Sequence, residues 1–237
     1  YGRQRTAEVG AENVFDFSLG NPNVSAPDFI RDAAVDILMH NDPIEVHGYT
    51  IAPGKPEVRE TIAADLSKRL DMRVAGKNLF MTAGAAASVT IVFKALCEVG
   101  DEFVTFAPFF PEYRVFVESV GGRLTVVPAK TDDFQINFDA FEHAVTSKTK
   151  AVIVNSPNNP SGAVYNAETI TRLADFLRRK EEEYGHTIFI IADEPYREIV
   201  YVEAAVPCIP NFYDDTIVCY SYSKSFSLPG ERIGYIL

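Results

Sequence analysis

A single lysine, Lys224, lies among small hydroxyl residues late in the sequence, and Arg232 follows eight positions later. A lysine becomes a covalent catalyst when its amine meets a carbonyl, as in the Schiff base that pyridoxal phosphate forms. The hydroxyls of Ser221 and Ser223 and the guanidinium of Arg232 are the groups that a phosphate beside such a Schiff base needs. A polar surface loop would have the same composition, so the interpretation depends on the rest of the chain.

Three other loops carry residue types suited to holding a ligand. Gly84, Ala85 and Ala86 open a predicted helix, and their backbone N–H groups and the helix dipole together form an anion site. An ordinary tight turn from strand to helix would read the same way. The chain has neither the lysine of a P-loop nor the glycine spacing of a dinucleotide-binding fingerprint.

The two remaining loops each follow an apolar segment and carry a polar side chain suited to a ligand. Prolines and a glycine around Asn159 fix its backbone, as a donor aimed at a ligand requires, although a plain Asn-Pro turn is the alternative. Asp193 ends an apolar run, where a carboxylate needs a cationic partner such as a protonated pyridine nitrogen. Tyr196, three residues later, can reach the phenolic oxygen of such a ring. Asp193 could instead cap the next turn or pair with a structural arginine.

These loops lie between short apolar segments and amphipathic helices that alternate along the chain. The pattern predicts helices over residues 27–40, 57–70, 84–97, 111–120, 138–145 and 167–184. It predicts strands over residues 78–82, 102–106, 124–127, 151–154, 187–192 and 216–220. Residues 1–50 read as irregular apart from the helix at 27–40. Near-continuous apolar strands separated by helices indicate a three-layer α/β/α architecture around a mostly parallel sheet. Ligands bind beyond the carboxyl ends of such strands, where all four loops fall.

Composition and charge narrow the class of protein. The 237 residues are 47% hydrophobic, which is typical of a globular chain, and no apolar run approaches the length of a membrane span. A formal charge of −11 argues against a nucleic-acid surface. Cys97, Cys208 and Cys219 are scattered among apolar residues, which predicts buried free thiols in a reducing cytoplasm. The histidines lack ligand spacing, so we predict no metal.

Taken in order, the loops resemble the motifs of class I/II aminotransferases, which are fold-type I pyridoxal-phosphate enzymes. The resemblance runs from about residue 17 to the end. Asn159-Pro-Ser-Gly resembles the family's Asn-Pro-Thr-Gly, with serine in place of threonine, and Asp193-Glu-Pro-Tyr196 resembles its Asp-x-x-Tyr. Ser221-x-x-Lys224 with Arg232 resembles its Ser-x-x-Lys followed by arginine. Each motif is modest alone, and the ordered set is specific.

The resemblance implies a role for each of these residues. Lys224, Asp193 and Tyr196 would be catalytic, and Asn159 and Tyr196 would also hold the ring oxygen of the cofactor. Phe110 would stack on the ring, and Tyr49 would reach the phosphate in the neighbouring subunit. Substrate would meet Asn159 and Gly20, the latter in a loop from Phe17 that closes over it. The phosphate would bind to Gly84, Ala85, Ala86, Ser221, Ser223 and Arg232.

The resemblance also implies the domain organisation and the reaction. Residues 51–237 would form the cofactor-binding large domain, incomplete at its C-terminal end, and residues 1–50 an N-terminal arm with part of a small domain. Because no Met opens the chain and it stops inside an apolar run, we expect a piece of a longer protein. The arginine that binds the substrate α-carboxylate in relatives would lie in the missing C-terminal small domain.

The implied activity is ping-pong transfer of an amino group from an L-amino acid to a 2-oxo acid, in a homodimer with the site at the subunit interface. Two alternatives stay open. The same cofactor and fold serve C–S β-lyases and other fold-type I enzymes, and an aminotransferase-like domain can act as the sensor of a transcription regulator. A nucleotide-binding protein is a poorer interpretation, since no phosphate fingerprint is present.

Overall fold

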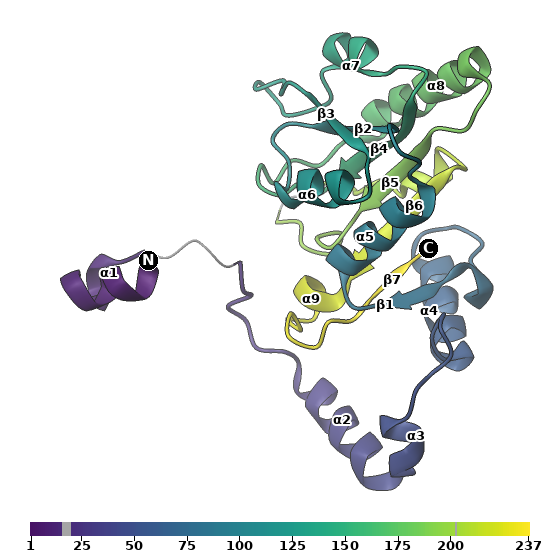
Figure 1. The fold of residues 1–237 in the computed structure, drawn as a ribbon. Coiled ribbons are helices and arrows are strands. Elements are labelled where there is room, and N and C mark those ends of the chain that lie inside the picture. Colours follow the sequence, from purple (N-terminus) through teal and green to yellow (C-terminus); the bar gives the residue numbers. More distant parts are fainter. Residues whose placement is uncertain (16–19, 202) are drawn as a thin grey trace.

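The computed structural model describes residues 1–15, 20–201 and 203–237, and within these ranges it shows one seven-stranded sheet (Figure 1). The strand order is β1-β7-β6-β5-β4-β2-β3. Five neighbouring strands from β3 to β6 run parallel, and β7 is antiparallel to both of its neighbours. The strands are β1 Phe80–Thr82, β2 Glu102–Phe106, β3 Arg123–Val127, β4 Thr149–Asn155, β5 Phe189–Asp193, β6 Thr216–Ser221 and β7 Gly234–Ile236.

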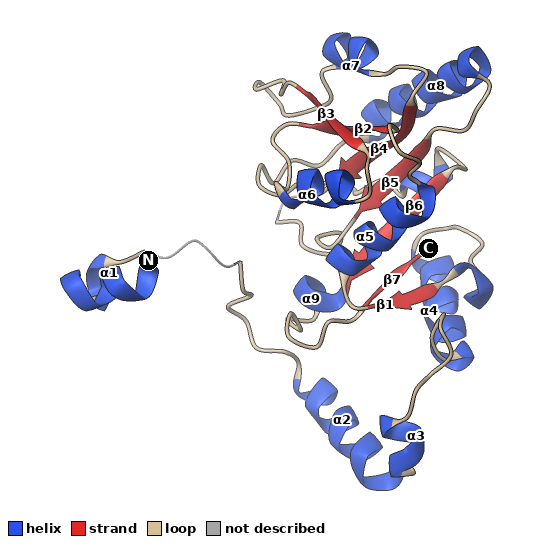
Figure 2. Ribbon diagram, in the orientation of Figure 1, coloured by secondary structure: helices blue, strands red, loops and turns tan. Residues whose placement is uncertain are grey.

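Helices cover both faces of the sheet, which confirms the predicted three layers (Figure 2). The pleat of β4 divides its side chains: Ala151 and Ile153 join a cluster with α5 and α6, whereas Val152 and Val154 join one with α7 and α8. A third cluster packs α4 against β1, β7 and the end of β6. The helices are α4 Pro56–Arg69, α5 Ala85–Leu96, α6 Glu112–Ser119, α7 Phe138–Ala144, α8 Ala167–Tyr184 and α9 Tyr222–Ser225.

Local signals set the ends of α8, the longest of these helices, at the residues that the sequence predicts. The Asn166 side chain accepts a hydrogen bond of 2.8 Å from Thr169 N, which caps the first turn. Gly185 ends the helix with a φ of 75°, a left-handed conformation that suits glycine. Between these caps, an apolar stripe that includes Ile170, Leu173 and Leu177 is buried against the sheet.

The N-terminal fifty residues contain more helix than predicted. The predicted helix is present as α2, Asp28–His40, but α1, Gly2–Val9, and α3, Pro43–His47, also form. None of the three buries a residue, and Figure 1 shows this segment extending away from the sheet. Local hydrogen bonds stabilise the two additional helices, such as the Asp42 cap that accepts from Ile44 N at 2.8 Å. Without a buried stripe they leave no apolar period to detect.

Three smaller expectations need correction. Cys219 is buried, but Cys97 and Cys208 are only half-buried, because the first ends α5 and the second lies in a loop against Met72. The strand predicted from residue 78 begins at Phe80, after a 3₁₀ turn, and the one predicted from 187 begins at Phe189.

The 3₁₀ turns of the described chain are Ala11–Asn13, Gly76–Asn78 and Ile209–Asn211.

The described residues contain neither a candidate membrane span nor a candidate metal cluster. In the ranges given above, no helix combines the length and apolar character needed to cross a membrane. Nor do three or more His, Cys, Asp or Glu side chains gather there in a way that could hold a metal ion.

Candidate active site

A cavity of about 360 Å³ lies where β4, β5 and β6 end. Eleven of the site residues predicted from the sequence line this cavity, and they come from segments far apart in the chain. They are Gly20, Ala85, Ala86, Phe110, Asn159, Asp193, Tyr196, Ser221, Ser223, Lys224 and Arg232. Gly84 adjoins this lining through Arg232, whereas Tyr49 is fully exposed and does not line the cavity.

One end of the cavity has the character of an anion site. Gly84 caps the N-terminus of α5 with a φ of 86°, and a Cβ built on it would lie 2.7 Å from Nη2 of Arg232. Among the described residues, Arg232 donates only to backbone carbonyls, those of Ala83 at 3.2 Å and Pro229 at 3.0 Å. The free N–H groups at the start of a twelve-residue helix and a guanidinium that pairs with no described carboxylate therefore lie beside the same space.

Two buried hydroxyls complete that end of the cavity. Ser221 ends β6 and Ser223 lies in the first turn of α9, and their Oγ atoms are 2.7 Å apart. The Ser221 hydroxyl also accepts a hydrogen bond of 3.2 Å from Ser223 N, so it caps α9. This short helix carries Lys224 into the cavity beside the two serines.

Asp193 lies at the end of β5 and is only 6% exposed. Its Oδ2 accepts a hydrogen bond from the Tyr113 hydroxyl, while its Oδ1 has no partner in the described part of the chain. Burial raises the pKa of Asp193 to about 6, and the Tyr113 hydrogen bond opposes that rise. No described arginine pairs with this carboxylate, which removes the structural-arginine alternative for these residues. Because Asp193 lines the cavity, its buried oxygen without a described donor indicates a group that arrives with the ligand.

Asn155 connects the Asp193 strand to the Asn159 loop. Its Nδ2 donates to the backbone oxygen of Asp193 at 2.8 Å, and its Oδ1 accepts from Asn159 N at 2.7 Å. The parallel register of β4 and β5 places Asn155 directly beside Asp193. The sequence motifs give Asn155 no role. Its position as a polar residue at the end of β4, the strand that precedes β5 in the chain, is nevertheless a signal from which a role could have been predicted.

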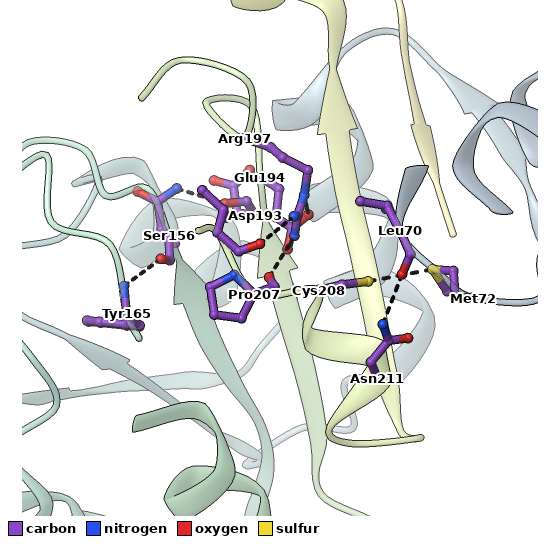
Figure 3. Close-up of polar contacts among 12 residues, drawn as sticks. Leu70, Met72, Ser156, Tyr165, Asp193, Glu194, Arg197, Pro207, Cys208 and Asn211 are labelled. Carbon is purple, nitrogen blue, oxygen red and sulfur yellow. Dashed lines mark hydrogen bonds and ion pairs between the residues drawn. The ribbon is translucent and has the colours of Figure 1, made fainter. Parts of the chain in front are cut away.

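A buried ion pair fixes the turn that presents Tyr196 (Figure 3). The Arg197 guanidinium contacts both Glu194 carboxylate oxygens at 2.6 Å and donates to Pro207 O at 3.0 Å. Both side chains are almost fully buried, so breaking the pair would leave an uncompensated charge inside the protein. Burial, followed by the charge of Asp193, raises the pKa of the Tyr196 phenol. That phenol is therefore held as a neutral donor.

Lys224 is half-buried in α9, and its ammonium donates to the backbone oxygen of Gly20. Burial lowers the pKa of Lys224, so a larger fraction of the amine is neutral than for an exposed lysine. Behind it, the Tyr220 hydroxyl lies 2.9 Å from Ser225 Oγ and donates to Glu198 Oε2 at 2.8 Å, which ties α9 to the sheet. Residues 17–19 of the predicted closing loop lie outside the described residues, so Gly20 is the first residue of that loop that can be placed.

A wider hollow of about 1220 Å³ continues from the cavity toward solvent. The two share Gly20, Phe110, Glu112, Asn159, Tyr196 and Lys224. The additional walls are mainly amide and apolar, and come from residues 21–24, the loop after β4 and residues 199–201. A substrate entering this way would reach Lys224 before the buried Asp193.

Comparison with known proteins places this chain in a family. A sequence model described as aminotransferase class I and II matches residues 12–237. The chain therefore belongs to the class I and II aminotransferase family, and its mostly parallel sheet with helices on both faces is that family's fold.

Individual relatives agree with this assignment. The solved structure of an aminotransferase from Eubacterium rectale has a TM-score of 0.97 and 54% sequence identity, covering 100% of this chain and 60% of its own. Aspartate aminotransferase from Thermotoga maritima has a TM-score of 0.87 and 30% identity, covering 99% of this chain and 60% of its own. A probable aspartate/prephenate aminotransferase from Aquifex aeolicus is 34% identical over 229 residues, which are 94% of this chain and 56% of that protein. The chain thus spans little more than half the length of these relatives.

Proposed function

We propose that the protein is a pyridoxal-phosphate-dependent aminotransferase that holds its cofactor as a Schiff base with Lys224. It transfers an amino group from an L-amino acid to a 2-oxo acid by a ping-pong mechanism. The observation that carries this proposal is the buried Oδ1 of Asp193, which lacks a partner among the described residues and belongs to a residue that lines the same cavity as Lys224. A protonated pyridine nitrogen supplies the missing donor together with a positive charge.

The residues of the cavity fit the rest of the cofactor. Its phosphate would lie against the start of α5, where Gly84 leaves the space that a Cβ would fill, with Ser221, Ser223 and Arg232 completing the contacts. Asn159 and Tyr196 would donate to the ring oxygen. Phe110, half-buried in the cavity wall, offers an aromatic face to the ring.

Pyridoxal phosphate, when bound, supplies an electron sink for a bond broken at the amino acid α-carbon. The chain's own groups position the cofactor and manage protons. Lys224 Nζ, with its lowered pKa, exchanges a proton with the substrate as a general base and then a general acid. Asp193 Oδ1 keeps a proton on the ring nitrogen, and the neutral phenol of Tyr196 keeps one directed at the ring oxygen.

The proposal extends to the assembly and the substrate. Residues 51–237 act as the cofactor-binding domain, and residues 1–50 as an arm with part of a small domain. The protein works as a homodimer in the cytoplasm, where Tyr49, fully exposed in the single chain, reaches the phosphate in the partner subunit. Gly20 and Asn159, which line both hollows, contact the substrate.

The visible absorption spectrum with pyridoxal phosphate tests the proposal directly. We expect the band of lysine-bound pyridoxal phosphate to give way to that of pyridoxamine phosphate when an amino acid is added, and to return with a 2-oxo acid. Release of sulfide and ammonia would instead identify a β-lyase, and exchange of the amino acid without conversion a sensor. If Lys224 does not bind the cofactor, only the absorption of free pyridoxal phosphate will be seen.

A substitution at Gly84 tests the phosphate site. In Gly84→Ala the new methyl group displaces the Arg232 guanidinium, and we expect the dissociation constant for pyridoxal phosphate to rise about tenfold or more. Gly185→Ala is the matched control, because Gly185 also has a positive φ of 75° but nothing lies within 4 Å of the new Cβ. Both variants lose about 1 kcal/mol of stability. Equal cofactor affinity in the two would exclude a phosphate beside Arg232.

A further inference from the structure

Tyr113 approaches Asp193 from a different layer of the fold. It lies in the first turn of α6, is 1% exposed, and packs in the cluster between α5, α6 and the sheet. Its hydroxyl donates to Asp193 Oδ2, and its ring stands edge-on to Phe110 with the centroids 5.6 Å apart. The sequence motifs assign this tyrosine no role, yet it is the described side chain that hydrogen-bonds the Asp193 carboxylate.

The hydrogen bond determines which carboxylate oxygen a ligand can use. Asn155 donates to the backbone oxygen of Asp193 and not to its carboxylate. That bond therefore does not restrain rotation of the carboxylate about its terminal torsion. Tyr113 removes that freedom by engaging Oδ2, which leaves the buried Oδ1 as the acceptor at the cavity. The hydrogen bond from Tyr113 thus orients Asp193 so that Oδ1 is the acceptor that a bound ligand would meet.

The same hydrogen bond opposes protonation of Asp193. Burial is the largest influence on this carboxyl and favours its neutral form, and the charge of Glu194 acts in the same direction. Arg197 compensates Glu194, while Tyr196 and Cys219, whose own pKa values burial raises, face Asp193 as neutral groups. Among these neighbours, Tyr113 is the one whose hydrogen bond favours the charged carboxylate.

We propose that Tyr113 is a positioning residue, which acts through Asp193 to keep a proton on the nitrogen of an aromatic cofactor bound in the cavity. This inference rests on the proposed function, since it requires pyridoxal phosphate as the occupant. Without the phenol, the buried carboxylate would compete better for the shared proton, and the ring nitrogen would become neutral.

Tyr113→Phe removes the hydroxyl and keeps the ring that packs α6 to the sheet. Tyr213→Phe is its matched control, because Tyr213 is 2% exposed and donates at 2.8 Å to Ile188 O, just before the opposite end of β5. Both variants lose one buried hydrogen bond, so a general loss of stability affects them alike. Only Tyr113→Phe changes the surroundings of Asp193.

The readout is the ¹⁵N NMR signal of bound ¹⁵N-labelled pyridoxal phosphate between pH 6 and 9, together with its dissociation constant. We expect a protonated ring nitrogen throughout in the wild type and in Tyr213→Phe. In Tyr113→Phe we expect the signal to move toward that of neutral pyridine and the dissociation constant to rise about tenfold. A signal in Tyr113→Phe that matches the wild type would overturn the inference.

Two further outcomes keep the inference separate from the proposed function and from folding defects. If the wild type does not form the absorption band of lysine-bound pyridoxal phosphate, the proposed function fails, and the inference fails with it. Should Tyr113→Phe not fold, proton NMR of the wild type decides instead. A Tyr113 hydroxyl proton held against a carboxylate resonates far downfield and exchanges slowly with solvent, and its absence refutes the contact.

Discussion

Replacing Lys224 by alanine is expected to lower the rate of transamination by on the order of 10⁴-fold, because one side chain both anchors the cofactor and moves the substrate proton. The cavity offers no described substitute: the other basic side chain in its lining, Arg232, is engaged by two carbonyls and stays protonated. Fold stability should change little, since the one polar contact of Lys224 among the described residues is the Gly20 carbonyl.

Steady-state kinetics and thermal melting of Lys224→Ala and Lys130→Ala together test this prediction. Lys130 is exposed, pairs with Asp133 at 2.7 Å and lies outside the cavity lining, so its loss removes a lysine without touching the site. We expect Lys224→Ala to retain the melting temperature and to bind pyridoxal phosphate without the absorption band of the lysine-bound cofactor. Residual turnover within tenfold of Lys130→Ala would show that another group moves the proton.

The strand ends of this site were predictable because their signal is local. A polar residue at the end of a buried apolar strand or in the segment that follows it, as at Asp193, Asn159 and Lys224, can be recognised without knowledge of its neighbours. The parallel arrangement of the strands follows from the helices between them, and it brings those ends to one edge of the sheet. Eleven of the nominated residues consequently line one cavity.

Tyr113 and Asn155 escaped prediction because their roles depend on tertiary neighbours. Tyr113 sits on a helix whose apolar stripe marks it as an ordinary core residue, and only packing across layers brings its hydroxyl to Asp193. Asn155 acquires its partner from the register between β4 and β5, which periodicity does not encode. The position of β7 between β1 and β6 has the same origin, since strand order depends on long-range pairing.

Asp193→Asn is expected to lower the rate of substrate proton removal by about 10²- to 10³-fold, as the loss of a fixed charge partner does in other active sites. Asparagine keeps the size of the side chain and an oxygen for the Tyr113 hydroxyl, but it carries no charge to hold a proton on the ring nitrogen. Single-turnover absorbance measurements, with cofactor bound before mixing, separate this effect from weaker cofactor binding. An unchanged single-turnover rate would assign the ring nitrogen a different partner.

The same substitution should stabilise the cofactor-free protein, and the effect should depend on pH. Burial raises the pKa of Asp193 from 3.8 to about 6, so between these values the folded state binds more protons than the unfolded state, and wild-type stability falls as pH rises. Asp193→Asn lacks this titration. At pH 8 we expect it to exceed the wild type by about 3 kcal/mol, and at pH 4 by much less. Denaturant unfolding at the two pH values measures the difference. A variant that is both slower and more stable would show that Asp193 stays buried and charged for the cofactor rather than for the fold; equal stability at pH 8 would contradict that conclusion.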